Sequence, residues 1–134
     1  MAPVVVDTDV ASFLFKRDSR ALAYRRHLIG NVWILSFMSL AELDWWTLRH
    51  RWGTSRRQRL DSFLGQFSVV PTDQQLCRLW AEATQQARQR GRPIQCADAW
   101  IAATALQLNA PLVTNNPSDF ASVGGLSLLA STSP

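Results

Sequence analysis

Four acidic side chains lie at places in the chain where ordinary surface charge would be unusual. Each ends, follows or interrupts an apolar segment, and they are Asp7, Glu42, Asp98 and Asp119. Carboxylates held beside apolar elements repel one another, and a pair about 4 Å apart costs about 4 kcal/mol at an effective dielectric constant of about 20. A bound divalent cation removes that cost, and hard cations such as Mg²⁺ take oxygen ligands. The pattern therefore predicts a carboxylate metal site assembled from distant segments.

Each of these acids also has a simpler structural interpretation. Asp7 could be a turn or helix-cap residue, and Asp119 ends the sequence Asn-Pro-Ser-Asp, which is good turn chemistry by itself. Glu42 stands three residues after Ser39, which is the spacing of a capping box. Asp98 could be a favourable first-turn charge on a helix dipole, although its predicted helix face is apolar, where an unpaired carboxylate is costly. For Glu42 the two interpretations are compatible, because a carboxylate has two oxygens.

Apolar periodicity divides the chain into strands that alternate with helices. Strands are predicted at 3–6, 32–37, 67–70, 112–114 and 126–130, and helices from about 10, from 39 to about 52, at 56–66, from 73 to about 90 and at 95–108. Thr8 or Asp9 is expected to cap the first helix and Ser39 the second.

This order of elements predicts a single α/β domain over residues 1–134. Its centre would be a parallel β-sheet of four to five strands flanked by helices, and the tail over about 130–134 would be frayed. Asp7 and the segment 114–119 each follow a strand directly. Both can therefore reach the crevice beyond the carboxyl ends of the strands, where open parallel sheets bind their ligands.

Composition narrows the class of protein. The chain has 134 residues and is 47% hydrophobic, which is enough for one core. No apolar run approaches the roughly 18 residues that span a membrane, and no signal peptide is visible, so we expect a cytoplasmic protein with both cysteines reduced. The net charge is +4, and all basic residues but Lys16 are arginines. Arginine suits phosphate or an acidic protein partner, and a solvated surface is the alternative.

The densest basic segment, at 49–59, has tryptophans beside it. Cationic side chains interleaved with aromatic rings hold phosphate and stack bases, so Arg49, Arg51 and Trp45 are predicted to contact RNA or a partner. A helix to about Trp52 would place Trp45, Arg49 and Trp52 on one face. The alternative is that the tryptophans are core or subunit contacts. A zinc site is not expected, since the two histidines lack ligand spacing with the cysteines.

Four segments in order resemble the acidic motifs of PIN-domain nucleases. They are Val4-Val5-Val6-Asp7-Thr8-Asp9-Val10, Ser39-Leu40-Ala41-Glu42-Leu43, Ala97-Asp98-Ala99-Trp100-Ile101-Ala102-Ala103-Thr104-Ala105 and Leu112-Val113-Thr114-Asn115-Asn116-Pro117-Ser118-Asp119-Phe120. The length is similar to that of VapC-type toxins of type II toxin–antitoxin pairs. The resemblance implies a PIN-like fold, Mg²⁺- or Mn²⁺-dependent ribonuclease activity, a homodimer and inhibition by a small antitoxin with a DNA-binding end.

The same resemblance implies roles for individual residues. Asp7, Glu42 and Asp98 correspond to the acidic triad and Asp119 to the fourth acid, while polar residues that orient the carboxylates are Thr8, Thr114 and Asn116. We therefore predict an endoribonuclease in which a metal-activated water attacks phosphorus. One alternative is a catalytically silent PIN-like module that binds RNA or protein. A phosphoacceptor with an acidic Mg²⁺ pocket is another, but it would need a late lysine and Lys16 comes too early.

Overall fold

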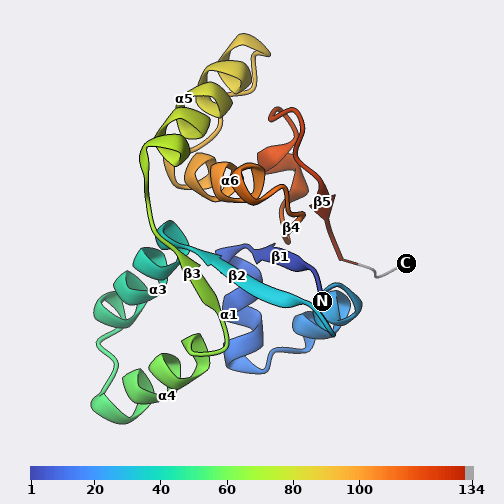
Figure 1. Cartoon of the computed structure of the whole chain (residues 1–134). Helices are drawn as coiled ribbons and strands as arrows, with labels where there is room; N and C mark the ends of the chain where they lie inside the picture. Colours follow the sequence, from blue (N-terminus) through green and yellow to red (C-terminus); the bar gives the residue numbers. More distant parts are fainter. Residues whose placement is uncertain (132–134) are drawn as a thin grey trace.

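A five-stranded parallel sheet forms the centre of the computed structural model, which describes residues 1–131 (Figure 1). The strands are β1 (Pro3–Val6), β2 (Val32–Ser36), β3 (Ser68–Val70), β4 (Leu112–Val113) and β5 (Leu128–Leu129), in the order β3-β2-β1-β4-β5. All four pairings are parallel. The predicted α/β class, the parallel sheet and the fifth strand are therefore confirmed.

Helices cover both faces of this sheet. They are α1 (Thr8–Lys16), α2 (Arg25–Leu28), α3 (Phe37–Arg49), α4 (Thr54–Leu64), α5 (Gln74–Gln89) and α6 (Cys96–Leu108), with 3₁₀ turns η1 (Ser19–Tyr24) and η2 (Pro117–Phe120). Successive strand residues point to opposite faces. Val4 and Val6 accordingly join a core cluster with α1, α2, α3 and α4, and Val5 joins a second cluster with α5 and α6. Figure 1 shows these two helical layers on either side of the strands.

The helix after β1 begins earlier than predicted. Asp7 is its N-cap, with extended backbone angles, and Oδ1 of Asp7 accepts a hydrogen bond of 2.8 Å from the Thr8 amide. The expectation that Thr8 or Asp9 would cap it is wrong, because β1 ends at Val6 and the first residue able to cap comes directly after it.

The helix after β2 also begins early, and this changes the interpretation of Glu42. Ser36 is the N-cap of α3, and its hydroxyl accepts from the Met38 amide at 3.1 Å. Ser39 lies inside the helix, so the predicted capping box with Glu42 is wrong. The helix ends at Arg49 rather than near Trp52, because Arg51 turns the backbone into the left-handed region at φ 53°.

Two segments of the chain are more ordered than the sequence predicted. The segment from 19 to 28, left without a prediction, forms η1 and α2. Tyr24 in this segment is buried, and its hydroxyl donates to Oδ1 of Asn115 at 2.6 Å. At the other end, the Ala130 carbonyl lies 3.0 Å from Nε2 of His27, so this part of the tail expected to fray is anchored. The last predicted frayed positions, 132–134, lie outside the described residues.

Other predicted boundaries agree closely with the structure. Asp73 caps α5 by accepting from the Leu76 amide at 2.8 Å, and α6 occupies almost the predicted range. Both cysteines are free thiols. Within residues 1–131, no helix is both long and apolar enough to cross a membrane.

Candidate active site

The topology brings the four predicted acids to one edge of the sheet. Asp7 follows β1, and Asp119 lies in η2 shortly after the neighbouring strand β4. Glu42 lies in the second turn of α3, which follows β2, and Asp98 lies in the first turn of α6. Since β2, β1 and β4 are adjacent and parallel, their carboxyl ends meet at this edge.

Asp7 is the most buried of these acids, with 6% of its surface exposed. While Oδ1 caps α1, Oδ2 accepts a hydrogen bond of 2.7 Å from the Thr114 hydroxyl. Burial raises the pKa of Asp7 from 3.8 to about 7, against these two hydrogen bonds, and the charges of Asp9 and Asp98 raise it further. A buried carboxyl that is poised near neutral pH is typical of functional sites.

Asp98 is half-buried, and the charges of the other acids affect its pKa. Its pKa rises from 3.8 to about 6, chiefly because burial disfavours the charged form and then because of the charges of Asp119, Glu42 and Asp9. Among the residues that the structure describes, the two ion pairs are Arg20–Asp18 and Arg78–Glu82. No basic side chain among the described residues therefore forms an ion pair with the acidic cluster.

The three polar residues predicted to orient carboxylates each have an acidic partner. Thr8 donates from its hydroxyl to Oε1 of Glu42 at 2.7 Å and also lies 2.8 Å from the Ser39 hydroxyl. Thr114 holds Asp7, and its hydroxyl accepts from the Asn116 amide at 3.0 Å.

The third of them, Asn116, donates from Nδ2 to Oδ2 of Asp9 at 2.8 Å. Asp9 thus belongs to the site, although the sequence predicted it only as a possible cap of the first helix. Ser39, which the sequence assigned to capping, instead contacts the hydroxyl that positions Glu42.

The donor chemistry of the cluster fits a divalent cation, but the side chains do not form a closed cage. Across residues 1–131, no three acidic, histidine or cysteine side chains lie together as a group that could hold a metal ion. Burial is the main cause of the raised pKa values of Asp7 and Asp98, and repulsion from the neighbouring carboxylates adds to it. Hard oxygen donors and excess negative charge are what Mg²⁺ or Mn²⁺ would neutralise.

A cavity of about 310 Å³ opens beside Asp98 and Asp119. Its remaining lining residues are Arg92, Pro93, Gln95, Ser118 and Ser122. Arg92 lies just beyond the predicted helix end at about residue 90, and it was not among the predicted site residues. Gly91 in the sequence indicates that the helix ends before Arg92. Arg92 therefore lies in the connection to α6, close to the acids.

The predicted contact surface on α3 is only partly as expected. Trp45 is 60% exposed, and the Arg49 guanidinium lies over its ring at 4.6 Å. Arg51 is exposed in the turn that ends the helix. Trp52 does not share this face, since its ring packs 4.7 Å from that of Trp46. The alternative interpretation as packing residues therefore holds for Trp46 and Trp52, and Trp45 is the ring that remains available.

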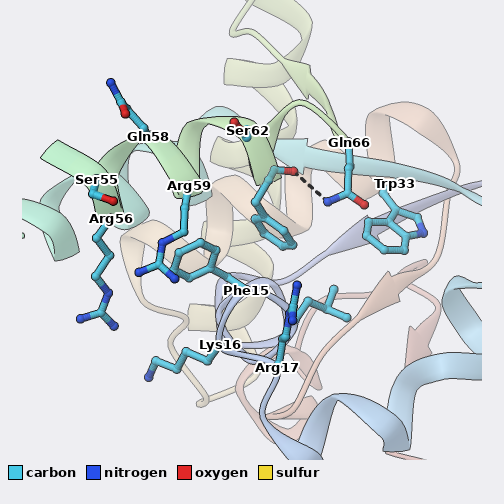
Figure 2. Close-up of a pocket in the computed structure, with 12 residues that line it drawn as sticks. Phe15, Lys16, Arg17, Trp33, Ser55, Arg56, Gln58, Arg59, Ser62 and Gln66 are labelled. Carbon is cyan, nitrogen blue, oxygen red and sulfur yellow. Dashed lines mark hydrogen bonds between the residues drawn. The ribbon is translucent and has the colours of Figure 1, made fainter.

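A second, larger cavity of about 1030 Å³ lies between α1, β2 and α4 and contains none of the four acids (Figure 2). Its rim carries four cationic side chains, namely Lys16, Arg17, Arg56 and Arg59, and aromatic rings of Phe15, Trp33 and Phe63 line it. Among residues 1–131, no acidic side chain lines it. The cavity thus combines positive charge with aromatic surface away from the acidic cluster.

The chain is similar in sequence to known proteins. The family model described as PIN domain matches residues 4–126. Ribonuclease VapC5 of Mycobacterium tuberculosis is 30% identical over 123 residues, which cover 90% of this chain and 87% of that protein.

Two solved structures have a similar fold. The crystal structure of VapBC-5 from Mycobacterium tuberculosis, a member of the VapBC family of toxin–antitoxin systems, has a TM-score of 0.72 at 26% identity, covering 97% of this chain and 99% of that one. VapBC2 from Rickettsia felis, bound to a DNA fragment from its promoter, has a TM-score of 0.84 at 23% identity, with coverages of 96% and 98%.

Proposed function

The chain belongs to the PIN domain family, and from this premise we propose that it is a metal-dependent endoribonuclease, the toxin of a type II toxin–antitoxin pair. The observation that carries the proposal is the uncompensated acidic cluster at the carboxyl edge of the sheet. Its two most perturbed members, Asp7 and Asp98, have pKa values of about 7 and about 6. The likeness to proteins named as VapC ribonucleases supports RNA as the substrate.

The residues that would hold Mg²⁺ or Mn²⁺ are Asp7, Glu42, Asp98 and Asp119. When bound, such an ion supplies a Lewis acid for a phosphoryl oxygen and lowers the pKa of a coordinated water. A cation bound there would favour the charged form of both carboxyls and so oppose the effect of burial on their pKa values.

The remaining residues of the site position these carboxylates. Asp7 is held from both sides, by the Thr8 amide and the Thr114 hydroxyl, which leaves its plane fixed. The Thr8 hydroxyl holds Glu42, and Asn116 holds Asp9. A carboxylate has about four lone-pair sites. Each of these acids therefore keeps acceptor capacity for a further ligand while it is oriented.

The proposal is tested by cleavage of single-stranded RNA. Purified protein should cleave with Mg²⁺ or Mn²⁺ and stop when a chelator is added, and Asp98→Asn should lose cleavage with its fold intact by circular dichroism. Asp44→Asn, which removes an exposed acid from α3, is the matched control and should cleave normally. Full activity of Asp98→Asn would remove the site assignment. RNA binding without cleavage at any metal concentration would identify a catalytically silent module instead.

We further propose an antitoxin as the protein partner, with a homodimer as the form that binds it. The similar structures described as VapBC toxin–antitoxin complexes support the partner class. Two surfaces combine arginine with exposed aromatic surface, which is the composition of interface hot spots. One is Trp45 with Arg49, and the other is the cavity of Figure 2, whose cationic rim complements an acidic segment.

A further inference from the structure

We propose that Arg92 is a substrate-positioning residue that binds a phosphate oxygen of the RNA beside the acidic cluster. This inference rests on the proposed function, because it names the group that holds the substrate of the same site. It starts from the cavity of about 310 Å³, which Arg92 lines together with Asp98 and Asp119. Arg92 is the one basic residue among the described residues that line it.

The backbone of Arg92 is fixed by the end of α5. Gly91 adopts φ 73°, a left-handed conformation that favours glycine, and the Arg92 amide donates to the Ala87 carbonyl at 3.1 Å. This arrangement closes the helix and turns the chain toward α6. The position of Arg92 is therefore set by the helix end, independently of its side chain.

Two hydrogen bonds join this turn to the segment that follows Asp119. The Ser122 hydroxyl donates to the Arg92 carbonyl at 2.9 Å, and Nη1 of Arg90 donates to the Ser122 carbonyl at 3.1 Å. The guanidinium of Arg92 itself donates from Nη2 to the Ser118 carbonyl at 3.4 Å, which is a long hydrogen bond. Arg90 thus has a structural role, whereas the Arg92 guanidinium lines the cavity, and most of its donors have no hydrogen-bond partner among the described residues.

The charges around the cavity indicate the ligand. A guanidinium carries five N–H donors, and the single hydrogen bond given above leaves four of them for another acceptor. Asp98 and Asp119 line the same cavity, yet neither lies within ion-pair distance of Arg92 in the part of the chain that the structure describes. A ligand of this cavity must offer anionic oxygens to Arg92. It must also tolerate the nearby carboxylates of Asp98 and Asp119, which are proposed to bind a cation. A phosphodiester meets both conditions, and arginine matches its geometry with paired donors.

The test compares Arg92→Gln and Arg92→Lys with Arg88→Gln, which removes the same charge from the exposed last turn of α5. Steady-state kinetics on a fluorescent single-stranded RNA, with Mg²⁺, give KM and kcat. Anisotropy titrations of the same RNA in chelator give affinity as a function of salt. We expect Arg92→Gln to raise KM and weaken binding about tenfold, as for the loss of a hydrogen bond to a charged group. The slope of log affinity against log salt should fall by about 0.7, the value for one phosphate contact with a single strand.

The other variants separate charge from geometry. Arg92→Lys should recover the salt slope while recovering affinity only in part, because lysine keeps the charge and loses the paired donors. Arg88→Gln should match the wild type in KM and salt slope.

A purely structural role for Arg92 gives a different outcome. If Arg92→Gln lowers kcat while affinity and salt slope stay at wild-type values, the side chain acts by holding Ser118 and the proposal is overturned. It is also overturned if Arg92→Gln and Arg88→Gln behave alike. A wild-type protein that binds RNA without cleaving it would contradict the proposed function alone, since the binding titrations still decide the role of Arg92.

Discussion

Replacing Asp7 with asparagine is expected to stabilise the metal-free protein at pH 8 and to leave it no more stable at pH 4. The folded protein holds the Asp7 proton up to about pH 7, whereas the unfolded chain releases it near pH 3.8. Between these values the folded state binds more protons than the unfolded state, so the free energy of unfolding falls as the pH rises. Asparagine does not ionise, so the free energy of unfolding of the variant does not fall in this way as the pH rises.

The size of the effect follows from the pKa of Asp7 and its hydrogen bonds. Each pKa unit corresponds to about 1.4 kcal/mol, so a rise from 3.8 to about 7 amounts to about 4 kcal/mol at pH 8. The amide has one carbonyl oxygen where the carboxylate has two, so one of the hydrogen bonds from Thr8 and Thr114 is lost or reversed, at a cost of about 1–2 kcal/mol. We therefore expect the free energy of unfolding of Asp7→Asn to be about 2 kcal/mol above that of the wild type at pH 8 and about 1 kcal/mol below it at pH 4.

Urea denaturation in chelator at several pH values between 4 and 8 measures this difference. At a typical m-value of about 2 kcal/mol/M, the midpoint of Asp7→Asn should lie about 1 M above that of the wild type at pH 8. Asp44→Asn changes the same chemical group at an exposed position of α3 and should follow the wild-type curve. Parallel pH profiles for Asp7→Asn and the wild type would show that Asp7 does not carry the buried charge, and the reasoning would fail.

Three further outcomes test neighbouring parts of the structure. Thr114→Val should raise the pKa of Asp7 further, seen as a steeper fall in stability between pH 5 and 8, because the hydroxyl that favours the carboxylate is removed; an unchanged profile would contradict this. Tyr24→Phe should cost about 1 kcal/mol in urea denaturation through the lost hydrogen bond to Asn115, and no change would mean that the contact is not formed. Trp45→Ala should leave the unfolding midpoint unchanged but weaken antitoxin binding, and unchanged affinity in a titration would exclude this surface.

The sequence predicted the sheet because its strands are short, β-branched and regularly separated by helical segments. It also predicted which acids reach one edge, since the positions after β1 and β4 follow from strand order alone. The helix starts were less predictable. Ser36 and Ser39 are chemically equivalent caps, and Ser36 takes the role because its strand pairing with Val70 ends there.

Contacts between distant segments account for the predictions that failed or were missing. The segment 19–28 has no helical periodicity of its own, and one tie that orders it is the hydrogen bond of Tyr24 to Asn115, 91 residues away. Asp9 joins the acidic site through Asn116, which is 107 residues away. Arg92 contacts Ser118 and Ser122, which only the folded chain brings near it. Periodicity and local spacing contain none of these relations.

The role of Asp7 as a helix cap and its proposed role as a metal ligand are compatible for a physical reason. A carboxylate at a helix N-terminus is favoured by the helix dipole and by the amide that it accepts from, and both act on its charged form. Burial opposes them and prevails, which is why the pKa rises despite two hydrogen bonds. The Thr8 amide and the Thr114 hydroxyl occupy one acceptor position on each oxygen, so one position on each remains for a cation. Asparagine retains the cap and removes the charge, so Asp7→Asn separates the two roles, whereas Asp7→Ala would remove both.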